Sequence, residues 1–288
     1  MLLIPGVGIG LNLFNNITIS HATVKILLNK IIKKIIPKNS PVFRLLFKWY
    51  DYKYWFPKYW LPTRWPYNVL EAYANYKAGH VSFIQVGSNN GVTGDPINKY
   101  IVNNHWQGIL VEPVPYLFEE LKKNYKNFEQ RLIFENAAIA SKNGKLKFYR
   151  LQKSDLPGLP VWYDQLGSFN KETVLSHKNT IPFFEDLFME DTVNAITFES
   201  LLHKHSIKKT DLVHIDAEGY DFEIIKLIPF NLLGVELIMF EHFHLSDADY
   251  KKAIQLLTKE GYILGIADTD TIGIKKNTLQ SMRAVKNK

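Results

Sequence analysis

From residue 67 onward, short apolar runs alternate with longer segments whose apolar positions recur every three or four residues. The short runs predict strands, and the longer periodic segments predict helices. Strands are expected at 81–87, 107–114, 131–140, 210–219, 234–243, 261–268 and 271–276. Helices are expected at 67–79, 93–104, 115–127, 221–228 and 247–260. This alternation predicts an α/β fold with a doubly wound, Rossmann-like sheet of seven strands, in which one of the last two runs antiparallel.

The chain divides into two parts of different charge. Residues 1–66 contain ten Lys or Arg and one acidic residue, whereas the remaining residues contain 25 basic and 27 acidic ones. We therefore expect a basic, aromatic N-terminal extension at 1–66 and a catalytic domain at 67–288, with an irregular insertion at about 145–195. Since the 288 residues include no cysteine, disulfides and thiolate metal sites are excluded.

The N-terminal extension allows two interpretations. Residues 25–36 pair isoleucines and leucines with lysines, as in a basic amphipathic helix, and four tryptophans follow within the extension. Such a segment either lies on an anionic membrane surface or packs on the catalytic domain with its lysines in solvent. The apolar stretch 1–14 is too short for a membrane span and lacks the basic start of a signal peptide. We expect a cytoplasmic protein with a peripheral membrane contact through 1–66, and no nucleic-acid partner.

The stretch FIQVGSNNGVTGD at 83–95 places glycines directly after a predicted strand. Gly87 and Gly91 let the backbone approach a ligand closely, and the following helix start offers free N–H groups. The spacing is G-x-x-x-G-x-x-G rather than the G-x-G-x-x-G of dinucleotide-binding proteins. This loop therefore favours an adenosine ligand other than a dinucleotide.

An acidic residue follows the second strand at the position that such a ligand requires. Glu112 comes 25 residues after Gly87, and a carboxylate there can accept both ribose hydroxyls of an adenosine. Its alternative role is a surface acid before a helix. After the third strand, Asn136 and the small Ala137 leave room for a flat adenine ring.

The fourth strand ends in VHIDAEG, which carries Asp216 and Glu218 to the same sheet edge. Either acid, or His214 in the strand, is a candidate general base for an attacking hydroxyl. The alternatives are a helix cap for Asp216 and a core position for His214. The fifth strand ends in Glu241, His242 and His244, with both histidines expected on one face. We take His242 as a catalytic candidate and assign no metal, although a metal site with Asp216 is an alternative.

Five segments together resemble the FkbM family of S-adenosylmethionine-dependent O-methyltransferases: QVGSNNG, VEP, NAAI, LGSFN and VHIDAEGYDFEIIK. The resemblance implies methyl transfer to a hydroxyl, as on a sugar in a glycan, glycolipid or natural product. It also implies a ribose contact at Glu112, followed by Pro113, and a ligand contact at Ser168. The methionine-side loop that it implies consists of Gly87, Ser88, Asn89, Asn90 and Gly91, after Gln85.

Two features leave the resemblance incomplete. Gln85 stands where most such loops carry an acid, and either Asp221 or Glu223 could close the EGY turn. The insertion, with Trp162, Tyr163 and Phe169, is expected to cover the cofactor and to shape the acceptor pocket. A catalytically degenerate binding or scaffold protein on the same fold is the alternative function.

Overall fold

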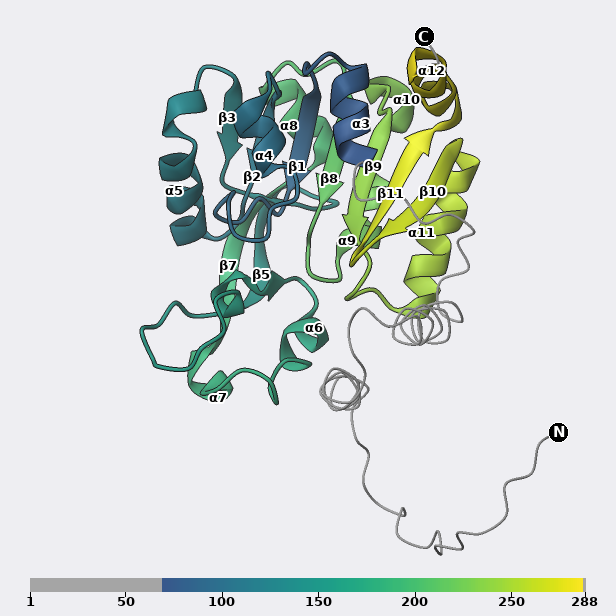
Figure 1. Ribbon diagram of the computed structural model, residues 1–288. Coiled ribbons are helices and arrows are strands. Elements are labelled where there is room, and N and C mark those ends of the chain that lie inside the picture. The colour runs from purple at the N-terminus through teal and green to yellow at the C-terminus, as the bar shows by residue number, and fades with distance from the viewer. Residues whose placement is uncertain (1–68, 287–288) are drawn as a thin grey trace, which may run out of the picture. The chain divides into compact units, whose positions relative to one another are not determined.

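Seven strands form one sheet in the computed structural model, which describes residues 69–286 (Figure 1). Their order is β10-β11-β9-β8-β1-β2-β3, and β11 alone among them runs in the opposite direction to the other six. The bounds are β1 (Ser82–Val86), β2 (Gln107–Val111), β3 (Leu132–Glu135), β8 (Leu212–Ile215), β9 (Leu237–Glu241), β10 (Tyr262–Ala267) and β11 (Asp270–Lys275). The predicted seven-stranded α/β sheet with one reversed strand near its end is confirmed.

Helices cover both faces of this sheet (Figure 1). One face carries α3 (Val69–Tyr76), α4 (Asn98–Asn103), α5 (Pro115–Asn124) and α12 (Lys276–Lys286), which share a core with the sheet. The other face carries α8 (Phe198–Lys204), α9 (Asp221–Leu227) and α11 (Asp247–Lys259). Short helical segments complete the described chain: η1 (Lys126–Phe128), η2 (Tyr163–Gln165), α6 (Lys171–Leu175), α7 (Phe184–Leu187) and α10 (Phe230–Leu233).

Burial on both faces explains why the central strands are almost wholly apolar. In the α3 face, the fully buried Trp106 stacks on Tyr100 with ring centroids 5.1 Å apart. Polar contacts fix α3 on the sheet beside this core. Lys77 Nζ lies 2.7 Å from an Asp211 carboxylate oxygen, and the Tyr73 hydroxyl donates to Glu236 at 2.8 Å.

Strand register brings three chain segments together at one edge of the sheet. β1 lies between β2 and β8, and Val86 at its end pairs in parallel with Val111 and Ile215. The chain turns from β1 to β2 on one side and returns to β8 on the other. Ligands of open α/β sheets bind at such a switch point, outside the carboxyl ends of the strands.

A second, four-stranded sheet takes up both ends of the predicted irregular insertion and a short stretch within it. Its order is β4-β7-β5-β6, with β4 (Ala138–Ile139), β5 (Gly144–Leu151), β6 (Gly167–Ser168) and β7 (Phe188–Ile196). β5 and β7 pair antiparallel along their whole length. The expectation of an irregular segment is wrong at both its ends. The polar residues 190–192 interrupt the hydrophobic pattern of β7, so that no strand was predicted there.

Two predicted elements have different bounds. The strand expected at 131–140 is divided into β3 and β4 by Asn136, whose side-chain amide donates to the Glu112 carbonyl at 2.8 Å. The helix expected at 93–104 begins only at Asn98, because Asp95 Oδ1 accepts the Ile97 N–H at 2.8 Å within the preceding loop.

The predictions for residues 1–66 lie outside the described residues. Within 69–286, every helix is too short or too polar to cross a membrane. The basic N-terminal extension and its membrane contact stay predictions from the sequence.

Candidate active site

A pocket opens at the sheet edge where β1, β2 and β8 end. It encloses about 580 Å³ of empty space, part of which is open to solvent. Six residues predicted from the sequence line it: Gly87, Asn89, Glu112, Pro113, Asp216 and Glu218. The second sheet and the segments beside it supply part of the wall through Phe148, Gln165, Gly167 and Phe169.

The backbone after β1 is pressed against the end of β8. Gly87 has φ +76°, and a Cβ atom at this position would lie 1.7 Å from the carbonyl oxygen of Asp216. Only glycine fits both the backbone conformation and the space. The next residue but one, Asn89, also has a positive φ of 53°, and its N–H donates to Glu112 Oε2 at 2.8 Å.

Glu112 is held at the end of β2 with its side chain on the pocket wall. The residue is only 4% exposed, and its other carboxylate oxygen accepts the Val114 N–H at 2.8 Å. Burial raises the pKa of Glu112 to about 7, although the two N–H donors act in the opposite direction. A carboxylate has about four acceptor positions. Two therefore remain for the neighbouring hydroxyls of a ribose.

Three other residues predicted to bind the cofactor support the loop from behind. The buried Ser88 donates its hydroxyl to the Gln85 carbonyl at 3.2 Å, and Asn90 Oδ1 accepts the Val92 and Thr93 N–H groups. Gln85 is buried under the loop.

The remaining predicted cofactor residues lie beside the pocket wall. Asn136 holds the Glu112 carbonyl, and Ala137 is buried next to the lining residue Ala138. Ser168 is buried, and its hydroxyl oxygen accepts the Asn170 N–H at 3.0 Å. The Gly91 carbonyl accepts a hydrogen bond from the Tyr125 hydroxyl at 2.8 Å, which fixes the far end of the glycine loop.

An acidic cluster lies where β8 and β9 end and β11 begins. Burial raises the pKa of Asp216 well above its usual value, and the negative charges of Glu241, Glu218, Asp221 and Asp270 add to this effect. Burial and the charge of Glu241 likewise raise the pKa of Asp270 to about 8. A carboxylate whose pKa is raised toward neutrality is a stronger base once it ionises.

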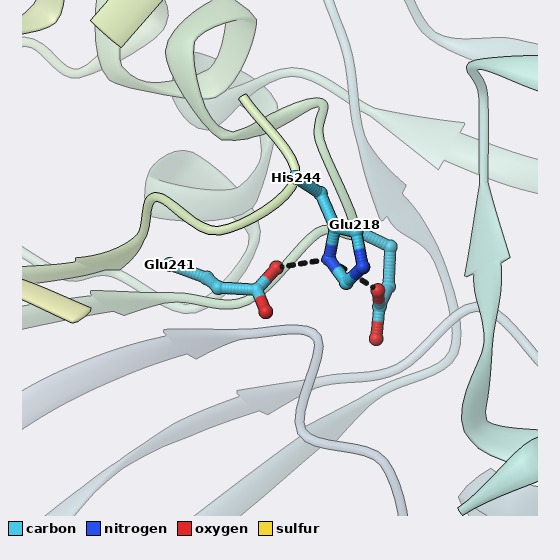
Figure 2. A group of neighbouring side chains, drawn as sticks. All are labelled: Glu218, Glu241 and His244. Carbon is cyan, nitrogen blue, oxygen red and sulfur yellow. Dashed lines mark hydrogen bonds and ion pairs between the residues drawn. The ribbon is translucent and has the colours of Figure 1, made fainter. Parts of the chain in front are cut away.

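His244 lies between two of these acids (Figure 2). Its Nδ1 is 2.8 Å from Glu241 Oε2 and 3.0 Å from Glu218 Oε2. Burial disfavours the charged ring, but hydrogen bonds and charges from the two glutamates outweigh it and raise the pKa of His244 to about 11. Its Nε2 lies 3.1 Å from Nε2 of His177. His177 is a residue of the insertion that no sequence signal indicated.

The EGY turn after β8 is closed by Asp221. This residue is fully buried, and its carboxylate accepts the Gly219 N–H at 3.2 Å and the Ala217 N–H at 3.4 Å. Glu223 instead pairs with Lys226 on the surface of α9 at 2.6 Å. The choice between the two acids, left open by the sequence, is thereby resolved.

His214 and His242 lie in the core rather than on the pocket wall. Burial lowers the pKa of His214 to about 4, so its ring is neutral. His242 packs on Tyr250 with ring centroids 5.2 Å apart and hydrogen-bonds to Thr271 at 3.1 Å. The expectation that His242 and His244 share one face is wrong, because β9 ends at Glu241 and the strand alternation stops there.

Comparison with known proteins assigns the family. The sequence matches the Methyltransferase FkbM domain over residues 85–264, which is more than half of the chain. The chain belongs to the FkbM methyltransferase family. The resemblance seen in the sequence is therefore confirmed, and this FkbM protein is a methyltransferase by family. No curated protein sequence matches it.

Solved structures with a similar fold are remote in sequence. Methyltransferase FkbM from Methylobacillus flagellatus KT has a TM-score of 0.43 and 9% identity over 68% of this chain and 44% of that chain. A putative caffeoyl-CoA O-methyltransferase from Staphylococcus aureus has a TM-score of 0.42 and 11% identity, covering 88% of this chain and 99% of that one. This FkbM protein spans less than half the length of the first relative. Family membership rests on the domain match.

Proposed function

We propose that this FkbM protein transfers the methyl group of S-adenosylmethionine to a hydroxyl group, on a sugar of a glycan, glycolipid or natural product. One observation carries the proposal. One pocket is lined by Glu112, the candidate ribose-binding residue, and by Asp216 and Glu218, the candidate general bases. Cofactor and acceptor sites can therefore share that space.

The residues present fit the cofactor. Glu112 offers two free acceptor positions for a ribose, and the Gly87 backbone leaves no side chain between the loop and the ligand. Phe148 and Phe169, in edge-to-face contact with centroids 5.3 Å apart, give an apolar wall for a flat ring.

When bound, the cofactor supplies a methyl group on a positively charged sulfur, which is a good leaving group. The protein has to hold the acceptor oxygen in line with that sulfur–carbon bond, so positioning provides much of the acceleration. Methyl transfer would form a carbon–oxygen bond and break the sulfur–carbon bond, and the hydroxyl proton would pass to a carboxylate of this chain. Asp216 suits this role, because it lines the pocket and its pKa is raised by burial and by neighbouring acids.

Aromatic rings beside the acidic cluster favour a sugar acceptor. The half-exposed Trp162 contacts His177 edge-on at 5.6 Å, and the half-exposed Phe243 contacts His244 at 4.9 Å. The rings of His177 and His244 also contact each other, so the four rings form a continuous row from Trp162 to Phe243. Exposed rings next to carboxylates suit a ligand with apolar C–H faces and polar hydroxyls.

The direct test is methyl transfer from labelled S-adenosylmethionine to a panel of monosaccharide, glycolipid and catechol acceptors. An O-methyl ether on a sugar, with S-adenosylhomocysteine as the second product, supports the proposal. A catechol ether alone would contradict the sugar assignment. Tight cofactor binding without transfer to any class would favour the scaffold alternative.

The proposed glycolipid acceptor also explains the basic N-terminal extension, whose structure lies outside the described residues. Lysines with interleaved apolar residues attract an anionic bilayer. Deletion of residues 1–40 should then abolish binding to anionic liposomes. Undiminished binding would contradict the membrane contact.

A further inference from the structure

One group of side chains at the edge of the pocket has the composition of a metal site. Glu218, Glu241 and His244 each offer one ligand atom, and these atoms all lie within 4.8 Å of one another (Figure 2). They come from three different positions, the turn after β8, the end of β9 and the loop that follows it. All three side chains are largely buried.

We propose that Glu218, Glu241 and His244 bind one divalent metal ion of the Mn²⁺ or Zn²⁺ type. Two carboxylates with one imidazole form a mixed oxygen and nitrogen donor set, which these ions accept. The ion would take the position of the proton that His244 Nδ1 shares with the two carboxylates.

The spacing of the donor atoms fits an ion. Ligand atoms at about 2.1 Å from a metal lie roughly 3 to 3.5 Å from one another in octahedral or tetrahedral geometry. The observed distances from His244 Nδ1 to the two carboxylate oxygens are 2.8 Å and 3.0 Å. His244 Nδ1 therefore already lies at ligand-to-ligand spacing from both carboxylate oxygens, which are within 4.8 Å of each other.

The far side of His244 has the partner that a ligating histidine requires. A metal-bound imidazole almost always donates its second ring N–H to an acceptor, which fixes its orientation. His244 Nε2 lies 3.1 Å from His177 Nε2, so a neutral His177 can accept that proton.

Charge also favours a cation at this position. Glu218 and Glu241 both face His244, which is the one imidazole described between the two glutamates. A divalent ion offsets more of this negative charge than a single imidazolium. Glu218 also lines the pocket, so the ion would be next to an acceptor hydroxyl and would lower its pKa. This catalytic role rests on the proposed function, whereas metal binding does not.

Calorimetric titration of the full-length, chelator-stripped protein with MnCl₂ and with ZnCl₂ tests the proposal. We expect one ion per chain in the wild type for at least one of the two metals. Glu241→Gln and His244→Phe should weaken binding at least tenfold, and His177→Ala by about 10- to 100-fold. Glu223→Gln, the same change at a surface glutamate, should bind as the wild type does. No binding by the wild type, or equal binding by the ligand variants, would overturn the proposal.

A second measurement uses the wild-type protein alone, with no substituted residue. Mn²⁺ added to the wild type should broaden the imidazole NMR signals of His244 and His177. The stacked pair His80 and His105, 5.0 Å apart before the starts of β1 and β2, should keep sharp signals. Broadening of both pairs, or of neither, would contradict the site. Because neither experiment contains S-adenosylmethionine or an acceptor, the metal proposal can fail while the methyltransferase proposal stands, and the reverse.

Discussion

The backbone of Gly87 lies against the carbonyl of Asp216, so closely that a Cβ atom on Gly87 would be 1.7 Å from that oxygen. This contact joins the loop after β1 to the turn after β8. Both segments line the pocket, one on the cofactor side and the other beside the acidic cluster. A side chain at position 87 would therefore push the loop after β1 away from the turn after β8.

Gly87→Ala should destabilise the protein by at least about 3 kcal/mol, because it combines a backbone clash with a positive φ. Gly94→Ala is the matched control. Gly94 has a similar φ of +73° but no atom within 4 Å of the added Cβ, so its substitution should cost only about 1 kcal/mol. Chemical denaturation of both variants measures the difference. Equal losses would show that the Asp216 contact is unimportant.

Asp216→Asn should lower kcat by roughly 10²- to 10⁴-fold, the range for loss of a general base. The affinity for S-adenosylhomocysteine should change much less, because Glu112 and the glycine loop are intact. In the wild type, kcat should rise with pH as Asp216 ionises, and this rise should vanish in the variant. Asp249→Asn, on the surface of α11, serves as the control. An unchanged pH profile in Asp216→Asn would assign the base to another group.

Stability should decrease as the pH rises from 6.5 to 8 in the presence of a chelator. The folded-state pKa values of Glu112, Asp270 and His244 are about 7, 8 and 11, all above their unfolded values. The folded protein therefore keeps protons that the unfolded chain releases, and its free energy of unfolding falls with pH. Each pKa unit corresponds to about 1.4 kcal/mol. Thermal unfolding should show this fall, and Asp270→Asn should reduce its slope.

Trp162→Ala should raise KM for a sugar acceptor about two- to twelvefold, since an aromatic contact contributes about 0.5–1.5 kcal/mol. The affinity for S-adenosylhomocysteine should stay the same. Leu232→Ala removes a more exposed apolar side chain on α10 and should change neither quantity. An unchanged KM in Trp162→Ala would remove this ring from the acceptor site.

The main sheet and half of the site could be predicted because their signals are local. Apolar runs marked the seven strands, and the parallel arrangement brings their carboxyl ends to one edge. Gly87, Glu112 and Asp216 each directly follow a strand or end it, so their convergence in one pocket follows from strand order alone.

The second sheet and the His177 contact depend on long-range packing. β7 carries the polar residues 190–192, and its strand conformation comes from pairing with β5 rather than from its own pattern. His177 lies 67 residues before His244, in a segment without regular periodicity. The prediction that His242 and His244 share one face of the strand failed because β9 ends at Glu241, one residue before His242.

Calorimetric titration with S-adenosylhomocysteine tests the central claim most directly. The wild type should bind it, and Glu112→Gln should weaken binding roughly 10- to 150-fold, as expected for hydrogen bonds to a charged group worth about 1.5–3 kcal/mol. Glu119→Gln, an exposed glutamate on α5 paired with Lys122, should bind as the wild type does. Binding of NAD in place of the adenosyl ligand, or equal binding by Glu112→Gln and the wild type, would contradict the account.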